Sequence, residues 1–469
     1  MRHVTSDELK PRARGILFWI AVVIFSLLVV YAIALANDTD EPLSTEILKE
    51  IEILKPVLDE KNAFYSFLGL PKLGQVDDLH EAGRDIVLND FEEFQTLELS
   101  NWYKKNPIYA PSFLLKCKSS SASCIDQNQA QANDAFEWRG KNKDLVSAVQ
   151  KIVESDTFFR QFSWDAHYFD SWYLLNTVRQ SQWAIATDFW IKGEDKQAIA
   201  SIKSFMHFCR GLLKTNSTLS TRNSAIACVV DDMRLVADWY VRMPNKRDRL
   251  SAELHKWLRP IGMDEIRMRE PLSDEGRLIT RAAKAFPSGS LTSTKAKSAN
   301  ESAKLEKLDL VLLQTSAIAK VMAFFVKPND IARWYYKKFD GMLYWADSGA
   351  AIAKPLWQPN ESKPWQYYLT RNYYGLHLAN QLEPELYEHY LHNAQSPLVY
   401  QTLLKAVIKC AAVGSGSDNE DCLKNRISEF KGPFYVDAAK WYEDKKFLYL
   451  PTPDVQAIKY GEARMYLSL

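Results

Sequence analysis

The stretch "WAIATDFWIKGEDKQAIASI", residues 183–202, decides the fold, because it has the pattern of two helices joined by one tight turn. Alanines and large apolar residues recur with helical spacing on both sides of Gly193. Glycine suits the turn, since it adopts positive φ without a steric penalty. The stretch therefore predicts an α-hairpin.

The segments after this hairpin continue the helical pattern, and each has one apolar face. The first face comprises Ile199, Ile202, Met206, Cys209 and Leu213, and the second comprises Ile226, Val229, Val230, Met233, Ala237 and Tyr240. The hairpin resembles the helical pair of tetratricopeptide-type repeats, but no second copy recurs at a fixed period. We expect an all-α body of stacked α-hairpins, solenoid-like but irregular.

Composition supports a packed helical body. The chain has 469 residues, 12% aromatic, with 14 Trp and only 17 Gly, which favours helices over a β-sandwich or disorder. Positive and negative residues balance, at 59 Lys+Arg against 58 Asp+Glu. This balance gives no electrostatic basis for binding nucleic acid.

The N-terminal region has the features of a single membrane span. Residues 16–36 carry no formal charge and are long enough to cross a bilayer as a helix. Basic residues precede this run and acidic residues follow it, so we expect residues 1–15 in the cytoplasm and the rest outside. Ala34 and Ala36 also fit a signal-peptide cut before Asn37, but the apolar run is longer than a usual signal core. Retention as an anchor is favoured, with cleavage as the alternative.

The cysteines agree with an exported body, because six of them fall in three close pairs. These pairs are Cys117 with Cys124, Cys209 with Cys228, and Cys410 with Cys422. An even count at short spacings predicts local disulfides, although other connectivities remain formally open. Reduced thiols in a cytosolic protein are the alternative. Zinc is disfavoured because no C-x-x-C spacing occurs.

Beyond the anchor, the sequence divides into five segments. Residues 37–60 form a stalk or first helix and 61–285 a first helical half. Residues 286–304, rich in Ser, Thr and Lys, form a flexible loop. A second helical half follows at 305–430. Residues 431–469 alternate aromatic and polar residues around short turns, which predicts a small β-like cap.

Six motifs occur in order along the chain: "NAFYSFLGL" (62–70), "FWIKGEDKQAI" (189–199), "VVDDMRLVADW" (229–239), "FFVKPNDIARWYYKKF" (324–339), "NYYGLHLAN" (372–380) and "GPFYVDAAKWYEDKKFLYL" (432–450). Together they resemble an uncharacterised proteobacterial family of membrane-anchored, extracytoplasmic α-helical proteins. The resemblance implies a periplasmic body on a single-pass inner-membrane anchor, and no chemistry. The tail departs from the Asp-Pro-Phe-Thr-Gly pattern of such proteins, since Gly432-Pro433-Phe434-Tyr435 stands there.

Two acidic motifs are candidates for acid–base chemistry. In "WDAHYFD", Asp165 or Asp170 with His167 would suit a hydrolase, although a helix start explains the motif more simply. In "VVDDMR", Asp231 and Asp232 are neighbours, and neighbours on a helix point about 100° apart. A salt bridge from either carboxylate to an Arg is therefore favoured over a shared acid–base pair.

A third motif, "ELYEHYLHN", is a candidate for metal binding. It contains Glu385, Glu388, His389 and His392, of which Glu385, His389 and His392 could place three ligands on one helix face. The motif lacks the H-E-x-x-H arrangement, so an amphipathic surface helix is the simpler interpretation. No G-x-S-x-G, Walker A or G-x-G-x-x-G pattern occurs, and we predict neither metal nor cofactor.

Aromatic clusters leave two interpretations open. "SWYLLNTVRQSQWA" (171–184), "ARWYYKKF" (332–339) and "KPWQYYLTRNYYG" (363–375) would line a glycan or peptide groove, or fill helix interfaces, which is favoured. The leading hypothesis is an envelope binding or scaffold protein with a protein or glycan partner, and not an enzyme. The alternatives are an envelope glycan hydrolase or lyase, and an immunity-type protein that binds one periplasmic partner.

Overall fold

A computed structural model of the chain is mostly helical in the residues that it describes. These residues are 6–37, 41–45, 47–48, 61–96, 124–155, 157–158, 165–215, 218–242, 246–285, 327, 329–336, 390–391, 393–412, 417–426, 440–442, 447–450 and 463–466. The predicted loop at 286–304 lies outside them.

The chain divides into two compact units, each built from segments that are separate in sequence. One unit comprises residues 1–49, 279–337 and 359–382, and the other comprises 50–278, 338–358 and 383–469. The second unit contains most of the described helices.

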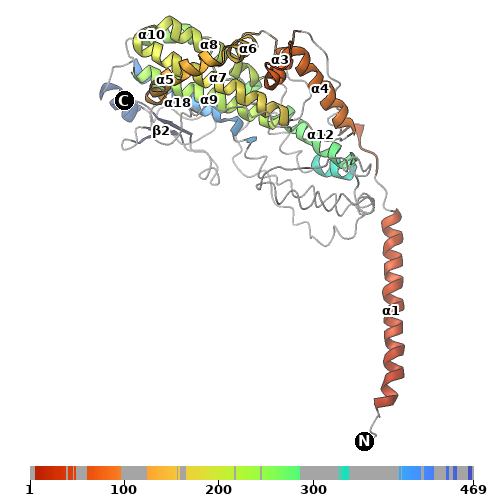
Figure 1. Ribbon diagram of the computed structural model, residues 1–469. Helices are drawn as coiled ribbons and strands as arrows, with labels where there is room; N and C mark the ends of the chain where they lie inside the picture. The colour runs from red at the N-terminus through yellow and green to blue at the C-terminus, as the bar shows by residue number, and fades with distance from the viewer. Residues whose placement is uncertain are drawn as a thin grey trace. The chain divides into compact units, whose positions relative to one another are not determined.

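The predicted α-hairpin is present in the second unit (Figure 1). Helix α7 runs over Asp165–Lys192 and helix α8 over Asp195–Leu212. Gly193 stands between them with φ +90°, the left-handed conformation that favours glycine. Both predicted apolar faces are buried, the second on helix α9 (Leu219–Arg242). The helical periodicity of this region was therefore a sound guide to its core.

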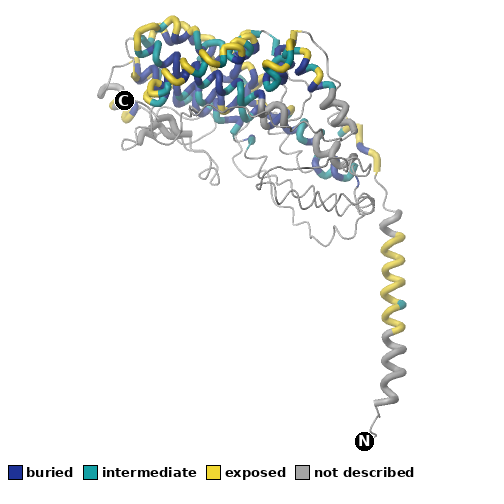
Figure 2. The backbone as a smooth tube through the Cα atoms, viewed as in Figure 1, coloured by how far each residue is buried: buried dark blue, intermediate teal, exposed yellow. Residues whose placement is uncertain are grey.

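Helices α7 and α9 form the centre of this unit (Figures 1 and 2). Helix α5 (Cys124–Lys141) packs on α7, and helix α18 (Ser396–Ala411) packs on α9. The indole rings of Trp190 and Trp239 stack 4.7 Å apart between α7 and α9, and Trp183 meets Trp239 edge-on at 5.7 Å. Trp183 belongs to one of the predicted aromatic clusters, and in the core it fills a helix interface.

Helix α3 (Ala63–Gly69) and helix α4 (Leu79–Thr96) cross so closely that two glycines are required at the contact. A Cβ on Gly83 would lie 1.7 Å from the carbonyl oxygen of Tyr65, and one on Gly69 would lie 2.1 Å from that of Leu79. The Asn62 side chain caps α3 by accepting a hydrogen bond from the Phe64 amide. The 3₁₀ helix η1 (Leu70–Lys72) then turns the chain.

Shorter elements complete the second unit. Its remaining described helices are α6 (Lys143–Val153), α10 (Arg247–Leu254), α11 (Met263–Ile266), α19 (Ser417–Arg426) and the first part of α12 (Arg269–Ala285). Within the predicted cap, the three short strands β1 (Lys440–Tyr442), β2 (Phe447–Leu450) and β3 (Ala463–Tyr466) pair antiparallel in the order β1-β2-β3. Strands β2 and β3 lie against α18.

In the first unit, helix α1 covers Ser6–Asn37 and residues 329–336 are also helical. The Arg333 guanidinium donates to the carbonyl oxygens of Glu41 and Pro42, which ties these two parts of the unit together. Apolar side chains of α1 between residues 18 and 33 are exposed (Figure 2). None of the described helices combines the length and the apolar character that a membrane span requires.

Candidate ligand-binding groove

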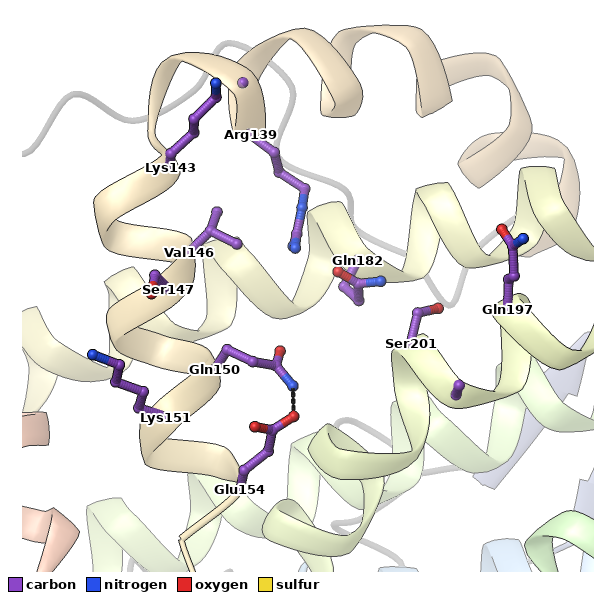
Figure 3. A pocket seen from close by; sticks show the side chains of 12 residues that line it. Arg139, Lys143, Val146, Ser147, Gln150, Lys151, Glu154, Gln182, Gln197 and Ser201 are labelled. Carbon is purple, nitrogen blue, oxygen red and sulfur yellow. Dashed lines mark hydrogen bonds between the residues drawn. The ribbon is translucent and has the colours of Figure 1, made fainter.

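An open groove of about 850 Å³ lies between helices α5, α6, α7 and α8 (Figure 3). Most of the residues that line it are polar or charged, but the larger share of its exposed surface is apolar and includes Val146 and Ala200. Such a surface combines apolar contact area with a few hydrogen-bonding and charged groups that can orient a ligand. The arrangement of its charges decides what it can bind.

Arg139 supplies a desolvated cation at one end of the groove. It comes from the last turn of α5, and Figure 3 shows its side chain extending into the groove. Its guanidinium donates to the Ser181 hydroxyl at 3.5 Å, and no carboxylate pairs with it among the described residues. Burial lowers the pKa of Arg139 to about 10, so the group remains charged near neutral pH.

Gln182 supplies an amide on the floor of the groove. Its side chain is only 7% exposed, and its position on α7 faces α6 and α8 across the groove (Figure 3). Its amide has no hydrogen-bond partner within the described part of the chain. The amide lines the groove, so a ligand there can donate to it and accept from it.

The remaining charges are distributed along α6. Lys143 stands at the start of this helix and Glu154 directly after its end. Glu154 accepts a hydrogen bond from Gln150, and both side chains extend toward the groove, whereas Lys143 and Lys151 extend outward from its rim (Figure 3). The groove is therefore positive near Arg139 and Lys143 and negative near Glu154. The dipole of α6 has the same direction.

Next to this groove, the core holds a buried ion pair that fixes α7 to α9. Arg179 donates to the Asp232 carboxylate at 2.6 Å and to the Cys228 carbonyl at 2.9 Å. The Trp183 indole N–H also donates to Asp232, at 3.1 Å. Burial raises the pKa of Asp232 to about 6, against the opposing effect of Arg179. The pair is shielded from solvent, which favours a structural role.

A second buried network joins α8 to α11. Glu265 accepts from Arg210 at 2.8 Å and 3.0 Å, from Arg259 at 3.0 Å and from the backbone N–H of Gly262 at 2.7 Å. Burial raises the pKa of Glu265, but Arg210 and these other donors outweigh it and lower the pKa. Arg210 also donates to the carbonyls of Arg259 and Pro260. This network closes the loop between α10 and α11.

Two of the three predicted cysteine pairs are bonded in the structure. Cys209 joins Cys228 with their Cα atoms 5.9 Å apart, and Cys410 joins Cys422 at 5.4 Å. Cys124 is buried at the start of α5. Its predicted partner Cys117 lies outside the described residues, so that pair stays a prediction.

Both carboxylates of the acidic "VVDDMR" motif form salt bridges with Arg, as predicted. Asp232 pairs with Arg179, and Asp231 pairs with Arg234 at 3.4 Å. A carboxylate oxygen of Asp232 and the sulfurs of Cys209 and Cys228 lie within 4.8 Å of one another. The two sulfurs are bonded to each other, so this group does not offer thiolates to a metal.

The other predicted motifs are placed less completely. Residue 165 begins α7, as the helix-start interpretation of "WDAHYFD" requires, but nothing is described of the Asp165, His167 and Asp170 side chains. The metal candidates Glu385, Glu388, His389 and His392 lie outside the described residues, as does the aromatic cluster at 363–375.

Sequence reasoning missed both the groove and the Arg210–Glu265 network. Arg210 gave a signal, because it interrupts the apolar stretch "FMHFCRGLL" next to a residue predicted to be buried. A charge in such a position implies a buried partner, although the sequence does not say which one. No such signal marks the groove residues Arg139, Gln182 and Glu154, because each is an ordinary polar residue in its local sequence.

The comparisons with known proteins leave the family undecided. No protein-family model, no curated protein and no solved structure matches the chain significantly.

Proposed function

We propose that the chain is a single-pass, membrane-anchored scaffold of the bacterial envelope whose helical body binds a protein partner in the periplasm. The groove between α5, α6, α7 and α8 carries this proposal, because it presents the amide of Gln182 beside Arg139, a partly desolvated cation that no described carboxylate neutralises. Both groups are stabilised when a ligand supplies their missing contacts.

Two further observations support the location. The uncharged run at 16–36 has a basic segment before it and an acidic one after it, and the described apolar side chains of α1 are exposed. Two disulfides in the body fit an oxidising compartment, since such bonds are rare in the cytosol. The resemblance to membrane-anchored extracytoplasmic proteins points the same way.

Binding is favoured over glycan hydrolysis by the charges in the groove. A glycoside hydrolase of the common type uses two carboxyl groups on opposite sides of the scissile bond. Among the described residues that line the groove, Glu154 is the one carboxylate. Its exposed position and the neighbouring Gln150 do not provide the desolvated environment that a general acid needs.

Site-specific photocrosslinking in living cells tests the proposal. A photoreactive amino acid at the exposed position Gln197, on the groove side of α8, should give a discrete adduct with one partner protein. The same amino acid at Lys405, exposed on α18, is the control. Adducts of equal yield at both positions, or none at Gln197, would contradict a binding role for the groove. Extraction of the full chain by alkaline carbonate would contradict the anchor.

A further inference from the structure

The groove has opposite charges at its two ends, and this polarity restricts its ligand. Arg139 and Lys143 lie at the end where α6 begins, and Glu154 follows the residue at which α6 ends. A ligand that places a carboxylate near the first pair and a cation near Glu154 has a charge distribution complementary to the groove. A uniformly basic ligand would be repelled near Arg139 and Lys143, and a uniformly acidic ligand would leave Glu154 without a cationic partner.

The length of the groove sets the size of such a ligand. Helix α6 has 11 residues and is therefore about 16 Å long, at a rise of 1.5 Å per residue. An extended peptide advances about 3.3 Å per residue, so about five residues span the distance between the charged ends. The ligand segment is short.

The chemistry between the ends matches a peptide backbone. Gln150 and Gln182 present amides that donate and accept hydrogen bonds, and Ser201 adds a hydroxyl (Figure 3). No aromatic ring belongs to the described lining of the groove. Sugars usually dock on such rings with their apolar faces, so the lining favours peptide over glycan.

We propose that this groove binds an extended peptide segment of about five residues, with a carboxylate against Arg139 and a cationic group against Glu154. The inference rests on the proposed function and assigns a chemical class to its partner. Arg139 anchors the carboxylate through charge-assisted hydrogen bonds, Gln182 pairs with a backbone amide, and Glu154 fixes the direction of the segment.

Fluorescence anisotropy with the full chain in detergent micelles tests this assignment. The probes are dye-labelled, end-blocked pentapeptides Glu-Gly-Ser-Gly-Lys and the reverse Lys-Gly-Ser-Gly-Glu, each with a matched peptide in which Gln replaces Glu. We expect one direction to bind, and the Gln peptide of that direction to bind about 10-fold more weakly, as the loss of a charge-assisted hydrogen bond implies. Equal binding of the Glu and Gln peptides would overturn the inference.

Variants of the groove identify the contacts by a double-mutant cycle. Arg139→Gln should lower the affinity for the Glu peptide about 10-fold and leave the affinity for the Gln peptide unchanged. Only the Glu peptide has the carboxylate that Arg139 contacts. A further matched peptide has Ala in place of Lys, and in Glu154→Gln this peptide and the Lys peptide should bind equally well. Lys405→Gln, a charge change on exposed α18, is the control and should alter neither affinity. An Arg139→Gln effect of equal size on both peptides would contradict a direct contact.

Two further measurements keep the result decisive. If Arg139→Gln lowers the helical circular dichroism, the variant Lys143→Gln at the exposed rim is used in its place. It should lower the affinity for the Glu peptide about threefold, and this difference should disappear at high salt. A tetragalacturonate oligomer tests the glycan alternative. If it binds with dependence on Arg139 while all the pentapeptides fail, the peptide assignment is wrong.

The two proposals fail separately. If photocrosslinking at Gln197 yields a partner but the peptides show no carboxylate preference, the binding role stands and the ligand class is wrong. If the peptides bind as expected but no partner is crosslinked in cells, the groove chemistry stands and the scaffold role is wrong.

Discussion

At the scale of single residues, two of the buried carboxylates in the body are each held by specific donors. Asp232 and Glu265 are both fully buried carboxylates, yet their pKa values move in opposite directions. Asp232 has Arg179 and the Trp183 indole as its partners, and burial dominates. Glu265 has two guanidiniums and a backbone N–H, and these donors dominate. The balance between desolvation and the charges and donors around each carboxylate decides the sign.

The first prediction concerns the pH dependence that Asp232 produces. Its pKa is about 6 in the folded chain, against an ordinary value of 3.8, so the folded state holds this proton more tightly than the unfolded state. The resulting stability is fully present below pH 4 and is lost as the pH rises through about 6, a change of about 3 kcal/mol. In Asp232→Asn this decline should be absent. Urea unfolding followed by circular dichroism between pH 4 and 7 measures it.

The control for that measurement is Asp188→Asn. Asp188 pairs with Lys192, and this ion pair is more exposed than the pair of Arg179 with Asp232. This variant should keep the wild-type decline. A decline of equal size in Asp232→Asn would show that another group titrates.

The second prediction concerns the charge on Glu265. In Glu265→Gln, Arg210 loses its counter-charge while its side chain stays 5% exposed, and we expect the free energy of unfolding to fall by about 3–5 kcal/mol. Because the pKa of Glu265 is lowered, the wild type should lose this contribution as the pH falls below the ordinary value of 4.5. Urea unfolding at pH 7 gives the magnitude. Lys203→Gln, which breaks the exposed pair with Glu253, should change stability by less than about 1 kcal/mol.

At the scale of elements, sequence patterns gave the helices near the hairpin reliably and the long-range contacts poorly. The faces of α8 and α9 were legible because burial repeats with the helical period. The pairing of Arg179 with Asp232, 53 positions apart, was foreseen only as a salt bridge to an unspecified Arg. The groove was invisible, since it forms where four helices meet and no single period marks it. Packing geometry, and not local pattern, determines such sites.

The third prediction concerns the α3–α4 crossing. In Gly83→Ala, the new methyl group would meet the Tyr65 carbonyl oxygen at 1.7 Å, and backbone cannot yield as a side chain does. The helices must separate, and we expect a loss of at least about 3 kcal/mol, from overpacking and the exposure of buried Tyr65. Thermal unfolding followed by circular dichroism measures this loss.

The control for this crossing is Gly211→Ala in α8, where nothing lies within 4 Å of the new methyl group. There the substitution should stabilise the chain by about 0.5–1 kcal/mol, because alanine is the better helix former. If both variants behaved alike, close approach at Gly83 would not be the reason for glycine.

At the scale of the whole molecule, the proposed location of the body outside the cytoplasm and the formation of its disulfides depend on each other. A chain with its N-terminus in the cytoplasm and its body outside should acquire its disulfides only after export. Retention of residues 1–37 and oxidation of Cys209, Cys228, Cys410 and Cys422 must therefore occur in the same molecules. Each can be measured without knowledge of the partner.

The last prediction tests that dependence in bacterial cells that express the full chain with an epitope before residue 1. After the outer membrane is opened, added protease should degrade the body and leave the epitope with the α1 segment protected, because the membrane shields residues 1–36. Alkylation without reductant should leave the four bonded cysteines unmodified. With residues 16–36 deleted, the chain should stay in the cytosol and the same cysteines should react, since reducing systems there keep thiols free. Protection of the body, or a mature chain that begins at Asn37, would instead show that this segment does not hold the protein in the membrane.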